Sequence, residues 1–220
     1  MIPLKDDLPT RSFPLMTLGF IILNVLTFFY QVSLGDQTEQ LLLAYGAIPF
    51  NLMHTLDAGV PVPAVATSLF TSMFLHGDFL HLGGNMLYLW IFGNNIEDTM
   101  GSMRFILFYL LCGVVAVYSH SWMMAQSRVP MIGASGAVSG ILGGYFLLFP
   151  RARVLTLVPF GFFITTVRVP ALIIIGFWFV AQVANSLFAG QAAGGIAWFA
   201  HIGGFIAGLV LICFFKKRKG

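Results

Sequence analysis

The chain has 220 residues, of which 58% are hydrophobic and only 9% charged, and its mean hydropathy is +0.90. Soluble globular domains carry about 25% charged residues, so this composition excludes a soluble domain and makes lipid the natural solvent for most of the chain. The formal net charge of +3 does not indicate nucleic-acid binding, because the basic residues are scattered or gathered in one tail.

Six apolar stretches have roughly the 20 residues that a helix needs to cross the hydrocarbon core, or come close to it. The first, 13–34, is followed by a mixed segment, 35–80, in which acids and prolines interrupt shorter apolar runs, so we expect it to form an external loop lying partly in the membrane interface. The other five predicted spans are 81–95, 103–124, 134–149, 169–189 and 196–215. The sequence therefore predicts an all-α fold, an integral membrane bundle of six transmembrane helices forming one domain over 1–220.

The distribution of Lys and Arg predicts the orientation of this bundle. Positively charged loops favour the cytoplasmic side of a membrane. With the short N-terminus 1–12 placed inside, ten of the eleven Lys and Arg residues face the cytoplasm, and four of these form the basic tail 216–220. Only Arg128 then lies outside. We therefore expect both termini in the cytoplasm.

In this topology the second, fourth and sixth spans run in the same direction, so their N-terminal ends gather near the external face. Each end carries polar residues: His81 and Asn85 one helical turn apart, Ser135 within a glycine-rich stretch, and His201. Polar groups at membrane depth are costly, and they usually mark a functional site or a packing contact.

Together these ends hold the groups that a serine hydrolase needs. The Ser135 hydroxyl becomes a good nucleophile when a neutral histidine such as His201 takes its proton. An oxyanion needs fixed donors, which His81, Asn85 and the free backbone N–H at the start of a helix can supply. All eight carboxylates precede residue 99 and none lies well inside a span, which favours a Ser–His dyad over a triad.

Small residues explain how the fourth and sixth spans can approach one another. Stripes of small residues at every fourth position allow close helix contact in lipid, and pairing two such stripes would bring Ser135 and His201 together. The stripes are Gly136, Gly140 and Gly144 in the fourth span, and Ala200, Gly204 and Gly208 in the sixth.

Taken singly, these residues have simpler interpretations. Ser135 suits a helix N-cap, His201 an interhelical hydrogen bond, and the glycines ordinary packing. Glu97, Asp98 and Arg104 suggest a turn with a local ion pair. The joint occurrence of base, nucleophile and oxyanion donors at the same end of three spans favours catalysis.

No metal or cofactor site is predicted. The two cysteines, Cys112 and Cys213, lie inside apolar runs, where they suit small core residues better than a disulfide framework. The sequence contains no CxxC or HExxH motif.

Three motifs make the sequence resemble the rhomboid family of intramembrane serine proteases, in its prokaryotic six-helix form. They are His81-xxx-Asn85, Gly133-Ala134-Ser135-Gly136 and Ala200-His201-Ile202-Gly203-Gly204-xxx-Gly208. With a family-like turn at 97–101, the resemblance covers roughly 67–212.

The resemblance implies that Ser135 is the nucleophile, that His201 is the general base, and that His81 and Asn85 bind the oxyanion together with the Ser135 N–H. It implies substrates that are transmembrane segments of other membrane proteins, cut at small residues without a metal or cofactor. It also implies a multi-pass protein of a prokaryotic plasma membrane. The oligomeric state is not predicted.

Two departures from the family pattern stand out. Thr67-Ser68 occupies the place of a Trp-Arg pair in the external loop, and Ser139 stands where some members pack a tyrosine on the catalytic histidine. If nothing else packs on His201, we expect its orientation to rest on packing of the sixth span, with a hydrogen bond to Ser139. His76 lies near the proposed site, and the sequence assigns it no role.

Two other classes of function stay open at this stage. One is a non-catalytic rhomboid-like protein that binds and escorts membrane clients, and such proteins lack the nucleophile or the base. The other is a channel or transporter, which would need ionisable pairs near the membrane midplane or an inverted repeat.

Overall fold

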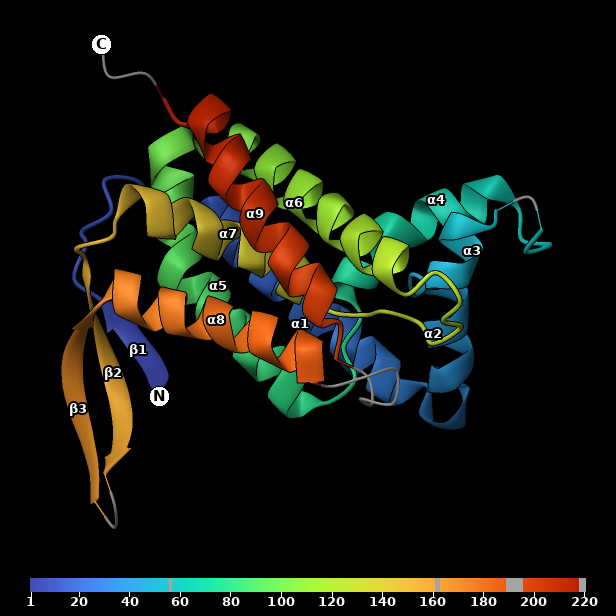
Figure 1. The fold of residues 1–220 in the computed structure, drawn as a ribbon, viewed down its shortest axis with the longest axis horizontal. Helices are drawn as coiled ribbons and strands as arrows, with labels where there is room; N and C mark the ends of the chain where they lie inside the picture. Colours follow the sequence, from blue (N-terminus) through green and yellow to red (C-terminus); the bar gives the residue numbers. More distant parts are fainter. Residues whose placement is uncertain (56, 161–162, 189–195, 218–220) are drawn as a thin grey trace.

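The computed structural model describes all residues except 56, 161–162, 189–195 and 218–220, and it confirms a helical membrane bundle (Figure 1). Each predicted span corresponds to one helix, with ends shifted by up to five residues. Ala189, the last residue of the predicted fifth span, lies outside the described residues, as does the tail beyond Lys217. The helices are α1 (Leu15–Ser33), α5 (Phe79–Met100), α6 (Ser102–Met123), α7 (Ser135–Leu148), α8 (Ala171–Phe188) and α9 (Trp198–Phe215).

Three of these helices, α1, α6 and α9, are long and apolar enough to cross a membrane unaided. The central helix α7 has 14 residues, which at about 1.5 Å each makes it shorter than the hydrocarbon core of about 30 Å. It is apolar, and it lies inside the bundle between the longer helices (Figure 1).

The segment 35–80 forms a group of short helices at one end of the bundle, which we call the loop end (Figure 1). Prolines set two of the helix starts, because a proline ring suits the first turn, where the N–H has no intrahelical partner. The elements are η1 (Gly35–Gln37), α2 (Thr38–Tyr45), α3 (Pro49–Met53), α4 (Val62–Thr71) and η2 (Ser72–Phe74).

A small antiparallel sheet lies at the opposite end, which we call the sheet end. Its strands, in the order β1-β2-β3, are β1 (Ile2–Asp6), β2 (Arg153–Phe160) and β3 (Phe163–Pro170). The sequence analysis did not predict this sheet, since it assigned no element to 150–168. The signal was the β-branched alternation of β2, which buries Val154 and Thr156.

Buried carboxylates fasten the N-terminal segment at the sheet end. Asp6 accepts hydrogen bonds from the Tyr145 hydroxyl (2.7 Å) and the Asn95 amide (2.6 Å), which connects β1 to α7 and α5. Burial raises the pKa of Asp6 above its ordinary value. Glu97 accepts from the backbone N–H groups of Met16 and Thr17, the first turn of α1. The expected local ion pair around 97–104 is therefore wrong, since Glu97 satisfies free helix N–H groups instead.

Helices α7 and α9 pack closely along their length, which confirms the pairing of the two small-residue stripes. A Cβ atom at Gly204 would collide with the backbone oxygen of Gly136, and one at Gly208 with the backbone of Gly140. Only glycine allows this approach, so the two helices meet backbone to backbone. The result fixes the N-terminal ends of α7 and α9 beside one another.

Candidate active site

Ser135 and His201 meet where α7 and α9 begin at the loop end. Ser135 is the first residue of α7 and His201 lies in the first turn of α9. The Nε2 atom of His201 is 2.9 Å from the Ser135 Oγ atom, which is hydrogen-bond distance. The glycine contact between the helices holds this geometry, so the approach of these two side chains does not depend on a flexible loop.

Gln182 of α8 lies on the other side of the His201 ring. Its Oε1 atom is 2.7 Å from His201 Nδ1, while its Nε2 atom donates to the backbone oxygen of Trp178 at 3.3 Å. The second bond orients the amide so that Oε1 faces the imidazole and can only accept. Nδ1 must then carry the proton, and Nε2 is left with a lone pair facing Ser135.

This arrangement contradicts the expected hydrogen bond from Ser139 to His201. The Ser139 hydroxyl donates to the backbone oxygen of Ser135 at 2.6 Å, one turn back along the same helix. Two indole rings flank His201 instead, those of Trp178 and Trp198, with centroids 6.0 and 6.2 Å from the imidazole. Among the described residues, the hydrogen-bond partner of Nδ1 is an amide and not a carboxylate.

His81 and Asn85 lie on α5, close to Ser135. Asp78 caps the start of this helix. The Asp78 carboxylate accepts from the His81 backbone N–H at 2.8 Å. The Nδ1 atom of His81 accepts from the Gly77 N–H at 3.5 Å, which leaves the ring proton on Nε2. Asn85 donates one amide hydrogen to the His81 carbonyl at 3.0 Å and keeps the other free.

Gly133 lets the His81 ring come close to the start of α7. Its φ angle is +120°, a backbone conformation that favours glycine. An added Cβ atom there would stand 2.7 Å from His81 Nε2. The Gly133 N–H donates to the Ser72 carbonyl at 2.8 Å, so the loop before Ser135 is also fixed.

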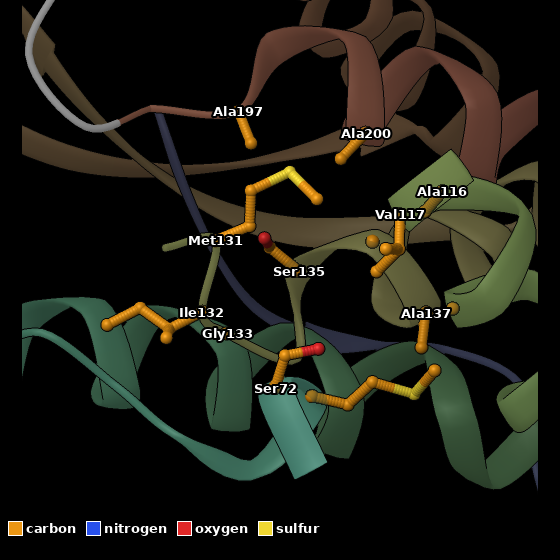
Figure 2. A pocket seen from close by; sticks show the side chains of 13 residues that line it. Ser72, Ala116, Val117, Met131, Ile132, Gly133, Ser135, Ala137, Ala197 and Ala200 are labelled. Carbon is orange, nitrogen blue, oxygen red and sulfur yellow. The ribbon is translucent and has the colours of Figure 1, made fainter. Parts of the chain in front are cut away.

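All four predicted site residues line one cavity of about 270 Å³, together with Trp178 and Tyr88. The structure therefore brings together every residue that the sequence analysis selected for catalysis. A second cavity of about 30 Å³ lies on the other side of Ser135 (Figure 2). Its walls come mainly from small side chains, including Ala116, Ala197 and Ala200, and from Met131.

His76 is buried beside the site but outside the dyad. Its ring packs against His81 with centroids 5.1 Å apart, and neither ring nitrogen has a hydrogen-bond partner among the described residues. Gln31 of α1 bonds to the His76 backbone oxygen and N–H, both at 3.0 Å. Burial lowers the pKa of His76 to about 4, so the ring is neutral at pH 7.

Sequence reasoning missed Gln182 and Trp178, although the sequence contained a signal. The two residues are one helical turn apart in the fifth span, and Gln182 is an uncharged polar residue at membrane depth.

Within the described part of the chain, no group of three or more His, Cys, Asp or Glu side chains is placed to hold a metal.

Comparison with known proteins gives a consistent family match. The model of the Rhomboid domain family matches residues 63–218. The mitochondrial Rhomboid protein 1 of Saccharomyces cerevisiae is 32% identical over 157 residues, 68% of this chain and 42% of that protein. The rhomboid protease GluP of Bacillus subtilis is 32% identical over 197 residues, 89% of this chain and 34% of that protein.

A third relative, the rhomboid protease AarA of Providencia stuartii, is 29% identical over 143 residues, 57% of this chain and 48% of that protein. This chain thus spans between a third and a half of the length of these three relatives. Two of the three carry the word protease in their names.

Proposed function

The chain belongs to the rhomboid family, and on that premise we propose that it is a serine endopeptidase that cleaves transmembrane segments within the membrane by a Ser135–His201 dyad. The observation that carries the proposal is the 2.9 Å approach of His201 Nε2 to Ser135 Oγ inside an accessible cavity. A serine hydroxyl and an imidazole in this relation are the two groups that acyl transfer requires.

In the proposed mechanism Ser135 Oγ attacks a peptide carbonyl while His201 Nε2 takes its proton. His201 then gives that proton to the leaving amine, and a water molecule in the cavity hydrolyses the acyl-enzyme with His201 again acting as base. Negative charge develops on the carbonyl oxygen in the transition state. The His81 Nε2–H, the free Asn85 amide hydrogen and the Ser135 N–H are the donors that we assign to it.

We assign Gln182 the role of a positioning residue in this mechanism. By accepting the Nδ1 proton, its amide oxygen favours the one imidazole tautomer that can act as base toward Ser135. In serine hydrolases with a triad, a carboxylate does this work and also stabilises the imidazolium. The neutral amide of Gln182 orients the His201 imidazole but adds no negative charge to stabilise the imidazolium.

The small cavity behind Ser135 suggests which residue precedes the cleaved bond. A space of about 30 Å³ lined by alanines has room for one or two water molecules or a side chain the size of alanine. Figure 2 shows Met131, Ala197 and Ala200 around the Ser135 hydroxyl, with Ser72 across from them. We therefore expect small residues to be preferred at the cleavage site and large aromatic residues to be rejected.

The topology predicted from the sequence places the proposed dyad relative to the membrane. With both termini in the cytoplasm, the loop end and the dyad lie toward the outer face of a prokaryotic plasma membrane. The substrate is then a transmembrane segment that reaches the dyad from the lipid and unwinds near that face.

The experiment is cleavage of labelled transmembrane substrates by the purified protein in liposomes, with wild type compared with Ser135→Ala and His201→Ala. We expect wild type to cut and both variants to be inactive while keeping the wild-type unfolding temperature. Ser139→Ala is the matched control, because its hydroxyl is one turn away and bonds only to backbone; it should cut normally. Intact substrates with wild type, or cutting by Ser135→Ala, would instead favour the client-binding alternative.

A further inference from the structure

A large cavity lies at the sheet end, at the opposite end of the bundle from Ser135. Its volume is about 1360 Å³. The N-terminal segment, the turn between α5 and α6, and the last residues of α7 and α9 form its walls. Four cationic side chains line it: Arg11, Arg104, Lys216 and Lys217.

The charge in this cavity is strongly positive. The carboxylate among its lining residues belongs to Asp98, which already accepts hydrogen bonds from the Arg11 and Ser12 N–H groups and from the Ser12 hydroxyl. Arg104 and Lys217 are held in place through other contacts. The Arg104 guanidinium donates to the Phe215 carbonyl at 3.4 Å, and the Lys217 N–H donates to the Thr99 carbonyl at 3.2 Å.

The same cavity has an apolar side. Leu148, Phe149 and Phe214 line it beside the cations, and the Phe214 side chain is 77% exposed on α9. An aromatic side chain that faces outward near the end of a membrane-spanning helix meets lipid and not water. The cavity therefore pairs an anion-binding wall with a wall that suits hydrocarbon.

We propose that this cavity binds an anionic phospholipid, with the phosphate among Arg11, Lys216 and Lys217 and the start of an acyl chain against Phe214. Basic pockets at the ends of transmembrane helices lie at the depth of the headgroups and attract anionic lipids. A soluble phosphate compound would use the cations and leave the apolar wall empty, so the mixed lining favours a lipid. The site does not depend on the proposed protease activity.

Cys213 gives this site a natural reporter. It lines the cavity and is exposed, whereas Cys112 is fully buried, so a thiol reagent labels Cys213 selectively. The protein is labelled there with a bimane fluorophore and placed in phosphatidylcholine nanodiscs that contain either spin-labelled phosphatidylglycerol or spin-labelled phosphatidylcholine. At equal mole fraction, we expect the phosphatidylglycerol to quench the fluorophore several-fold more strongly.

Two triple variants that lose the same charge distinguish lipid binding in this cavity from general attraction of anionic lipid to a positively charged surface. The variant Arg11→Gln, Lys216→Gln, Lys217→Gln removes three cations from the cavity and should abolish the preference, because a single cation near the membrane surface already contributes about fivefold. Arg151→Gln, Arg153→Gln and Arg168→Gln removes three exposed cations from around the sheet and should keep the wild-type ratio. Equal quenching by both lipids in wild type, or equal loss in both triple variants, would overturn the proposal.

Discussion

The helix that carries Ser135 contacts α9 on one face and α8 on another, and the two contacts are built differently. Between α7 and α9, Gly204 and Gly208 lie against backbone atoms of α7, so neither helix can shift without a collision. Between α8 and its neighbours the contact is made by side chains. Phe179 stacks on Phe205 at 4.4 Å, and Gly176 has only ordinary contact with Phe146.

The outer face of α8 strengthens this contrast. Phe177 and Val180 are 63% and 64% exposed, and in a membrane both face lipid. The proposed nucleophile and base, Ser135 and His201, therefore lie on two helices that meet backbone to backbone, while Gln182 lies on a helix held by side chains. The contact between Gln182 and His201 therefore depends on side-chain packing of α8.

The largest expected effect concerns the proposed oxyanion donors, which lie on α5. In the double variant His81→Ala, Asn85→Ala, kcat should fall by at least the roughly 10²–10³-fold that loss of one such donor costs in a soluble protease, with a much smaller change in KM. The reason is that these donors act on charge that exists only in the transition state. Steady-state cleavage in liposomes measures both constants, and equal activity of the double variant and wild type would remove the assignment.

Replacing one glycine of α9 and one glycine of α8 by alanine tests whether the two helices are packed differently. Gly208→Ala places a Cβ atom against the backbone of Gly140 and should destabilise the fold by about 1–3 kcal/mol or more. Gly176→Ala, the matched change on α8, meets Phe146 at 3.6 Å and should be neutral or slightly stabilising. Thermal unfolding in detergent compares them, and similar unfolding temperatures would show that the two contacts are not different in kind.

A smaller effect is expected from Gln182, which lies on the helix held by side chains. Gln182→Met keeps the shape of the side chain but removes the acceptor, and loss of one hydrogen bond of about 1.5 kcal/mol lowers kcat roughly tenfold. Gln182→Glu restores an acceptor and adds a charge that favours the imidazolium, so the acid limb of the pH–rate profile should move to higher pH. An acid limb that stays at the wild-type pH in Gln182→Glu would contradict the contact between residue 182 and His201.

The smallest effect concerns His76, whose pKa is lowered by burial to about 4. In the unfolded chain His76 has an ordinary histidine pKa of about 6.5. Between pH 4 and pH 6.5 the unfolded chain therefore binds the proton more readily than the folded protein does. The contribution of neutral His76 to stability is therefore present above pH 6.5 and lost as the pH falls toward 4. His76→Gln should flatten this part of the dependence of the unfolding temperature on pH. An unchanged slope would contradict it.

The sequence predicted the membrane bundle and the grouping of the four candidate site residues in one cavity because both depend on strong local signals. Long apolar stretches mark the spans, and Ser135, His201, His81 and Asn85 are polar residues at the same ends of like-oriented helices. The glycine spacing also predicted which helices touch, because small residues at every fourth position leave one face of a helix bare.

Other features could not be predicted, because they depend on side-chain directions. Whether the Ser139 hydroxyl faces His201 or its own helix backbone is decided by a rotamer, and the structure shows the second. Gln182 was equally visible as a polar residue in a span, but its contact with His201 depends on how α8 is rotated. The sheet joins residues more than 140 positions apart, and β1 was too short and polar to be recognised alone.

The most direct test of the central claim is covalent labelling of the wild-type protein with a fluorophosphonate, followed by mass spectrometry of the modified peptide. Such a probe reacts with a serine only when a base activates it. The proposed dyad predicts one adduct, on Ser135, that is lost in His201→Ala and kept in Ser139→Ala. No adduct on Ser135, or an adduct that forms equally fast in His201→Ala, would contradict the proposal that His201 activates this serine.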